Sequence, residues 1–270
     1  MPDNAFADVI ALNGDHIGPQ GAGLELSEGQ LELIPAAPAE PEPDDRLRSL
    51  SVSNIVQLAR CPKQFYWTVV RPLPRRPSPA ARLGQELHRW IEIRSIGQGT
   101  LDEIEDPPVP EEPTFAGLKA TFESSPYATL APRFTEQRFV IAIDEGYLVR
   151  GRIDAVYVHD DSSWELVDFK TGREPNPGDG LTALQLSIYA MAAQQLWGMS
   201  PEELKVTYFY LATGRAASVA ATDLELTREW LVDAFRRVET GAFEPRPGRL
   251  CYSCDFLERC AAGRAHLRRH

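Results

Sequence analysis

The four cysteines of this 270-residue chain constrain its fold more than any other feature. Cys61 stands alone, and Cys251, Cys254 and Cys260 form a C-x2-C-x5-C cluster about 190 residues later. If all four thiolates bind one metal centre, the first helix and the C-terminal segment must lie side by side. Closing so long a loop is feasible because its entropic cost grows only slowly with length. We therefore expect a cysteine-ligated staple at the C-terminal end of the fold.

The expected compartment supports metal ligation over disulfides. Met1-Pro2-Asp3-Asn4 lacks a basic start, and neither a signal-like apolar region nor an apolar run of the roughly 20 residues that span a bilayer follows. We expect a cytoplasmic protein without a membrane partner, and cytoplasmic thiols are normally reduced. Cysteines in such a setting are better metal ligands than disulfide partners.

Two metal centres suit four thiolates, a tetrahedral Zn²⁺ and a [4Fe–4S] cluster. Zinc ribbons usually pair one C-x2-C with another, whereas here one ligand comes singly and the last spacing is five. This spacing favours the [4Fe–4S] cluster, with a structural role. The remaining possibility, unligated cysteines packed as small hydrophobes, fits a single cysteine better than a clustered set.

The net charge of −11 is concentrated at the N-terminal end. Residues 1–50 contain ten Asp or Glu against Arg46 and Arg48, a net of −8, which leaves −3 for residues 51–270. An acidic, proline-rich run at residues 35–45 buries too little apolar surface to offset its ordering entropy. We predict a disordered tail at residues 1–49, either a solvated linker or a strip that competes with DNA, and one folded domain at residues 50–270.

Hydrophobic periodicity and turn residues predict the elements of this domain. The predicted helices are a short one that runs to Cys61 and is capped by Ser53 or Asn54, one with the stripe Leu83, Leu87 and Ile91, one at residues 181–197 and one at 227–240. The predicted strands are residues 135–143, 147–158, 164–170 and 205–212, with turns at 144–146 and 160–163. A loop is expected at 102–113, which is acidic and rich in proline. This order predicts an α/β core with a mixed sheet.

Two carboxylates and a lysine are predicted to converge on neighbouring strands. Strand periodicity puts Asp154 on one face of its strand and Asp168 together with Lys170 on one face of the next. Such a group can hold a hard divalent cation through oxygen ligands, and a cation-bound water is an effective nucleophile toward a phosphodiester. Asp and Lys on strands are also commonplace as solvated pairs, so the signal depends on its companions, Gly84-x3-His88 before it and Gln185-x3-Tyr189 after it.

Taken in order, these motifs resemble the PD-(D/E)XK nuclease superfamily, and within it the RecB-like iron–sulfur group found in AddB, Adn helicase–nucleases and CRISPR-associated nucleases. The resemblance covers residues 51 to about 262, with Gly151-Arg152-Ile153 in place of the proline of the superfamily name and Asp168 in place of the commoner Glu. It implies a restriction-endonuclease-like core with a mixed central β-sheet flanked by helices. It also implies metal ligation by His88, Asp154 and Asp168, with Lys170 serving the attacking water, Gln185 and Tyr189 setting the active centre, and Glu136 as a further acidic position.

The resemblance further implies a Mg²⁺- or Mn²⁺-dependent deoxyribonuclease, with exonuclease action favoured, that acts on single-stranded DNA or DNA ends in recombination and repair. The sequence contains no G-x4-G-K-[ST] motif, so a superfamily 1 helicase partner would be a separate chain. Two other readings stay open: a catalytically silent iron–sulfur DNA-binding module, and a zinc-stapled structural protein. Phe65, Tyr66 and Trp67 are expected to pack in the core or to stack on bases. Phosphate contacts are predicted at Arg71, Arg75, Arg76, Arg82, Arg246, Arg249, Arg264, Arg268 and Arg269.

Overall fold

The computed structural model describes residues 45–75, 78–95, 114–174, 180–220 and 224–269, all within the compact unit Pro43–His270. The predicted tail lies outside the described residues except for its last five positions, as does the predicted loop at residues 102–113.

A mixed six-stranded sheet forms the centre of the unit, with the order β1-β3-β4-β5-β6 and β2 paired to β3. The pairs β2–β3, β3–β4 and β5–β6 are antiparallel, whereas β1–β3 and β4–β5 are parallel. The predicted meander therefore forms as β2, β3 and β4. The strands are β1 (Ser49–Ser51), β2 (Phe134–Ala142), β3 (Leu148–Val158), β4 (Trp164–Lys170), β5 (Leu204–Tyr210) and β6 (Arg215–Ala220).

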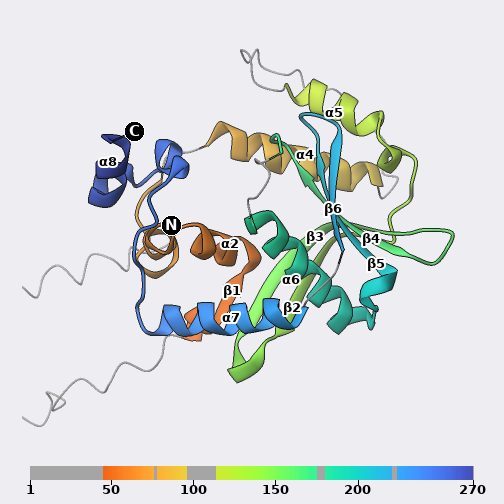
Figure 1. The fold of residues 1–270 in the computed structure, drawn as a ribbon. Coiled ribbons are helices and arrows are strands. Elements are labelled where there is room, and N and C mark those ends of the chain that lie inside the picture. The colour runs from red at the N-terminus through yellow and green to blue at the C-terminus, as the bar shows by residue number, and fades with distance from the viewer. Residues whose placement is uncertain (1–44, 76–77, 96–113, 175–179, 221–223, 270) are drawn as a thin grey trace, which may run out of the picture. The chain divides into compact units, whose positions relative to one another are not determined.

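Helices cover both faces of this sheet. Figure 1 shows α4 and α5 on one side of the strands and α6 and α7 on the other. The α-helices are α2 (Val52–Arg60), α3 (Pro62–Phe65), α4 (Pro79–Ser95), α5 (Phe115–Glu123), α6 (Gly180–Trp197), α7 (Leu224–Glu239) and α8 (Ala261–Leu267). The short turns of helix are η1 (Asp45–Arg48), η2 (Tyr66–Val70), η3 (Pro126–Ala128), η4 (Asp144–Gly146), η5 (Pro201–Glu203), η6 (Arg249–Ser253) and η7 (Leu257–Arg259). None of the helices in the described ranges has the length and apolar character needed to cross a membrane.

Each face of the sheet has its own apolar core. The larger core joins the strands to α2, α6 and α7 through side chains such as Ile55, Leu186 and Phe235. The smaller core joins the opposite face to α4 and α5 through Leu87 and Phe122. This arrangement of a mixed sheet between helices is the α/β architecture that the sequence predicted.

The structure differs from the sequence prediction mainly where local signals are weak. The cap of α2 is Ser51, whose hydroxyl accepts a hydrogen bond from the Asn54 N–H, so the expected cap at Ser53 or Asn54 is wrong. Strand β1 has three residues, and β6 is rich in alanine, so neither carries a strand pattern. Helix α5, which was not predicted, does carry a signal: Thr114 caps it and Leu118 and Phe122 form its buried stripe.

Gly151 allows two elements to pack closely beside the candidate site. A Cβ at Gly151 would lie 2.3 Å from Phe139 Cζ and 2.8 Å from Val52 Cγ2, well inside van der Waals contact. The Phe139 ring in turn meets Tyr189 edge-on, with centroids 6.0 Å apart. The absent side chain at Gly151 therefore lets α2, β2 and α6 meet.

We predict that Gly151→Ala lowers the free energy of unfolding by about 1–3 kcal/mol, because overpacking forces neighbouring side chains and backbone to shift. Urea denaturation measures the effect. Gly172→Ala is the matched control, since a Cβ there meets no atom within 4 Å. Equal losses in the two variants would contradict the packing argument.

Candidate functional site

Two buried aspartates lie where β3 and β4 separate. The β3–β4 ladder extends to the pair Ala155↔Val167. Just beyond it, the Phe169 N–H donates to Asp154 Oδ2 at 2.8 Å, in place of a ladder bond. Asp154 is 9% exposed and Asp168 4% exposed. The structure thus brings together the two carboxylates whose convergence strand periodicity predicted.

Asp168 is held by three side chains that the sequence had singled out. Lys170 Nζ lies 2.6 Å from Asp168 Oδ2. The Gln185 amide and the Tyr189 hydroxyl both donate to Asp168 Oδ1, at 2.9 and 3.0 Å, and Gln185 Nε2 also donates to the Tyr189 oxygen at 2.8 Å. Gln185 and Tyr189 face the same carboxylate because they are one helical turn apart on α6. A cation, an amide and a phenol therefore fix this carboxylate in one orientation.

His88 and Glu136 complete a group with the geometry of a metal site. His88 Nδ1 lies 3.3 Å from Asp154 Oδ2 and 4.0 Å from Glu136 Oε1. One ligand atom from each of His88, Glu136 and Asp154 lies within 4.8 Å of the others. Glu136 has a φ of 49°, a conformation that is uncommon outside glycine and that clusters at functional sites. Arg152 Nη1 holds its other oxygen at 2.6 Å.

Crowding of the carboxylates disfavours their charged forms. Burial and the charge of Asp154 raise the pKa of Asp168, against the opposing effect of Lys170. Burial also raises the pKa of Glu136, although Arg152 opposes the shift. Burial lowers the pKa of His88, but the neighbouring Asp154 carboxylate outweighs it, so the pKa lies above its ordinary value. A divalent cation would relieve the repulsion among these acids and would compete with a proton for His88.

The donor set fits a divalent cation. Within the described part of the chain, buried His88 Nδ1 lies 3.3 Å from Asp154 Oδ2, and buried Asp168 Oδ2 lies 2.6 Å from Lys170 Nζ. Carboxylate oxygens suit Mg²⁺ or Mn²⁺, whereas an imidazole ligand is typical of transition metals rather than of Mg²⁺. His88, Glu136 and Asp154 are the residues whose ligand atoms lie close enough together to share one ion, and Asp168 lines the same groove.

The site opens into a groove of about 570 Å³ between the β2–β3 hairpin, α2 and α6. Three arginines that sequence reasoning missed line this groove: Arg138, Arg150 and Arg152. A signal for two of them was present, because Arg150, Arg152 and Asp154 alternate along one strand and so point to the same side.

Residues 49–261 match the family model of the PD-(D/E)XK nuclease superfamily. The chain belongs to this superfamily. No curated protein matches the chain significantly.

Solved structures resemble this superfamily member in fold. A candidate exonuclease from Eubacterium rectale matches with a TM-score of 0.51 and 14% identity, over 90% of this chain and 94% of its own. The protein SSO0001 matches with a TM-score of 0.46 and 19% identity, over 86% of this chain and 92% of its own. The likeness to the E. rectale protein agrees with a restriction-endonuclease-like core, and at this identity it concerns the fold alone.

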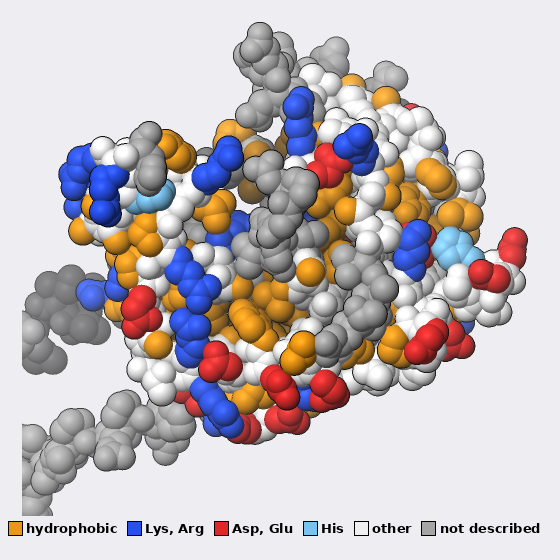
Figure 2. Space-filling view, in the orientation of Figure 1, with side chains coloured by type: hydrophobic (Ala, Val, Ile, Leu, Met, Phe, Trp, Pro, Cys, Tyr) orange, Lys and Arg blue, Asp and Glu red, His pale blue; other side chains and the backbone are white. Residues whose placement is uncertain are grey.

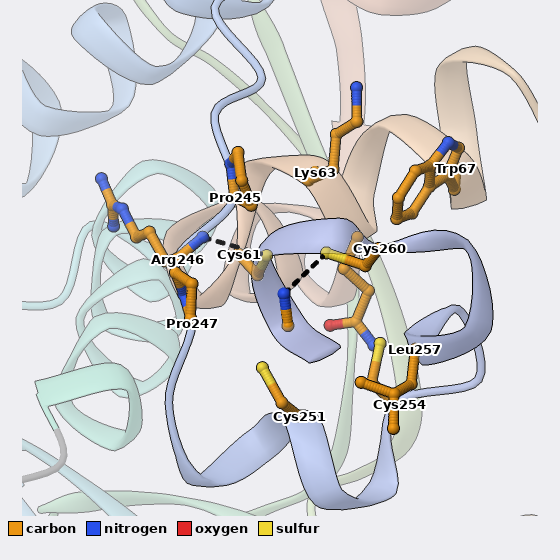
Figure 3. A pocket seen from close by; sticks show the side chains of 12 residues that line it. Cys61, Lys63, Trp67, Pro245, Arg246, Pro247, Cys251, Cys254, Leu257 and Cys260 are labelled. Atoms are coloured by element: carbon orange, nitrogen blue, oxygen red, sulfur yellow. Dashed lines mark hydrogen bonds between the residues drawn. The ribbon is translucent and has the colours of Figure 1, made fainter. Parts of the chain in front are cut away.

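The four cysteines of the superfamily member come together around one hollow (Figure 3). Cys61 lies at the junction of α2 and α3, Cys251 and Cys254 lie in and just after η6, and Cys260 caps α8. All four are free thiols of intermediate burial. The structure therefore brings the first helix beside the C-terminal segment, as the staple requires.

The surroundings of the thiols suit a bound cationic centre. Backbone N–H groups of Arg246, Gly248 and Gly263 donate to Cys61, Cys251 and Cys260 at 3.3–3.5 Å. Burial raises the pKa of the Cys254 thiol, and the other three sulfurs add to the shift. A Cβ on Gly263 would lie 3.4 Å from the Cys260 sulfur and 3.5 Å from the Cys251 sulfur, so glycine keeps the hollow open there. These N–H donors stabilise thiolates, and a metal centre would offset their mutual repulsion.

The aromatic residues and arginines predicted near the cysteines have different surroundings. Phe65 is fully buried, and Tyr66 and Trp67 pack on Phe243 and Phe256, so core packing is confirmed over base stacking for Phe65.

The guanidinium groups of Arg246 and Arg264 donate to backbone carbonyls. Figure 2 shows Lys and Arg side chains gathered where α8 lies in Figure 1. The exposed members of the predicted set are Arg71, Arg75, Arg82, Arg246, Arg249, Arg268 and Arg269, whereas Arg76 lies outside the described residues.

We predict that Asp154→Asn weakens Mn²⁺ binding at least about tenfold, since a ligand should matter no less than an outer-shell partner. Titration of the protein with Mn²⁺, followed by electron paramagnetic resonance, measures the free ion. Asp160→Asn, a change of the same kind on an exposed turn, should bind like the wild type. Equal affinity in all three proteins would refute the site.

Proposed function

We propose that this protein is a Mg²⁺- or Mn²⁺-dependent deoxyribonuclease that hydrolyses phosphodiester bonds in single-stranded DNA or at DNA ends, with exonuclease action favoured. One observation carries the proposal: His88, Asp154, Asp168 and Lys170 converge at the buried end of an open groove. Membership of a nuclease superfamily supports it. The likeness to a candidate exonuclease agrees with the fold that the proposal needs.

The residues divide the chemistry among them. A divalent cation bound by His88, Asp154 and Asp168 would supply an acidified water and neutralise charge on the scissile phosphate. Lys170, held at 2.6 Å from Asp168, is placed to orient that water. Gln185 and Tyr189 fix the orientation of the Asp168 carboxylate. Arg152 holds the Glu136 carboxylate next to the proposed ligands. Positioning of this kind lowers the barrier because the groups need no rearrangement during reaction.

For the cysteines we propose a structural [4Fe–4S] cluster, which would assign the protein to the RecB-like iron–sulfur group. In tetrahedral Zn²⁺ sites, with Zn–S bonds of about 2.3 Å, the sulfurs lie about 3.8 Å apart. Among the described residues, however, no three cysteine sulfurs lie within 4.8 Å of one another. The wider spacing supports a larger centre than a single zinc ion. Backbone N–H donors to three of the sulfurs are a further feature that tunes such clusters.

The proposed setting is DNA recombination and repair in the cytoplasm, alone or with a superfamily 1 helicase on another chain. A second candidate function is a catalytically silent iron–sulfur module that binds DNA. The cysteine hollow is compatible with this alternative, because a structural centre there would serve the fold with or without catalysis. The two functions differ in whether bound DNA is cut.

We expect Asp168→Ala to abolish metal-dependent cleavage of end-labelled single-stranded DNA while leaving DNA binding intact. The variant removes a proposed metal ligand and the partner of Lys170. Asp160→Ala, on an exposed turn, should cleave like the wild type. Wild-type protein that binds DNA but never cuts it with Mg²⁺ or Mn²⁺ would favour the silent module.

We expect anaerobically purified protein to contain iron and sulfide, and Cys254→Ser to lose both. Loss of the centre should lower the free energy of unfolding by more than about 4 kcal/mol, as expected when a structural metal is removed. Elemental analysis and thermal unfolding measure the two effects, with Ser253→Ala as the neighbouring control. Stoichiometric zinc without iron would contradict the cluster and would support a zinc staple instead.

A further inference from the structure

Three arginines form a charged wall next to the proposed active site. Arg138 of β2 and Arg152 of β3 are direct cross-strand partners, and Arg150 is two residues further along β3. All three line the groove that also contains Asp154 and Asp168. The wall therefore continues outward from the metal site along the β2–β3 hairpin.

The positions of these three arginines add little to the stability of the fold. Like charges directly opposite each other on paired strands are destabilising. Arg152 is compensated by Glu136, whereas Arg150 donates, within the described ranges, to the Ser49 hydroxyl and carbonyl at 2.9 and 3.0 Å, both of which are neutral. Arg138 is exposed and forms no ion pair with any carboxylate of the described residues. Among the residues that the structure describes, two guanidinium charges are thus left without a balancing acid.

A bound anion would balance both charges. The planar guanidinium group matches phosphate oxygens in a bidentate fashion. Val140, opposite Arg150 in the register and 59% exposed, adds an apolar contact that suits a sugar or a base. Asp154 and Arg150 are four residues apart on a strand, which is about 13 Å. The ligand is therefore longer than one phosphate group and carries both charge and apolar surface.

We infer that the β2–β3 wall is the track of a single nucleic-acid strand, in which Arg138 and Arg150 bind phosphates on one side of the bond at the metal site. The groove volume of about 570 Å³ is in the range of pockets for drug-sized ligands, which suits one strand rather than a duplex. Cleavage of the strand rests on the proposed function, whereas its binding does not. None of the arginines predicted from the sequence belongs to this track.

The test is equilibrium binding of fluorescent oligothymidylate to the full-length protein in EDTA, measured by anisotropy over a range of salt concentrations. Each phosphate contact on a single strand contributes about −0.7 to the slope of log K against log salt. Arg138→Gln and Arg150→Gln should each make the slope less negative by about 0.7, and the double variant by about 1.4. Arg215→Gln removes an equally exposed charge, ion-paired to Glu174 and outside the groove, and should leave the slope unchanged.

Arg138→Lys, which keeps the charge, should retain the wild-type slope and so separates charge from misfolding. In cleavage assays with Mg²⁺ or Mn²⁺, the glutamine variants should raise KM and leave kcat nearly unchanged, since they lie beyond the metal site.

Cleavage with unaltered salt slopes in both variants would overturn the track and leave the nuclease proposal standing. Altered slopes without cleavage by the wild type would support the track and overturn hydrolysis. Tighter binding of a duplex than of a single strand would overturn the single-strand assignment.

Discussion

The hydrogen bond from the Phe169 N–H to Asp154 Oδ2 marks the point where β3 and β4 stop pairing, and the site depends on it. Buried backbone donors need partners, and strands that separate inside a core would otherwise leave this one unpaired. By accepting it, the side chain of Asp154 lets the strands diverge without that cost. The same oxygen lies 3.3 Å from His88, so one carboxylate both ends the ladder and begins the proposed metal site.

The second constraint is the connection between β4 and β5. Because these strands are parallel, the chain must cross over the sheet between them, and α6 makes that crossing. The helix that the topology requires is also the one that brings Gln185 and Tyr189 to Asp168. Tyr189 is further held by Phe139, whose ring needs the space over Gly151. The geometry of the candidate site and the packing of the core therefore depend on the same side chains.

The sequence predicted the helices and strands whose apolar residues follow a regular period. It also predicted the site residues that belong to a recognisable motif. Alternation along residues 147–158 and 164–170 predicted β3, β4 and the convergence of Asp154 with Asp168, because a strand has only two faces. Spacing alone did not predict the pairing of Arg152 with Glu136, since it depends on the φ of 49° at Glu136. Strands β1 and β6 were missed because their pairing partners, rather than their own residues, determine them. The acidic net charge of the chain also gave no indication of the arginine wall, because the net charge of a whole chain does not report the local charge of one groove.

The candidate site takes side chains from helices on both faces of the sheet, His88 from α4 and Tyr189 from α6. Around Tyr189, α6 is buried on nearly every side, with Ile188, Ala190 and Ala192 fully enclosed. Its amide protons should exchange only when the whole unit unfolds. Helix α4, which carries His88, contributes buried Leu87 and Ile91 and partly buried Leu83 and Trp90 to the smaller core. His88 Nδ1 of α4 lies 3.3 Å from Asp154 Oδ2 of β3. A cation held by both residues would therefore join α4 to the sheet, on the face opposite α6.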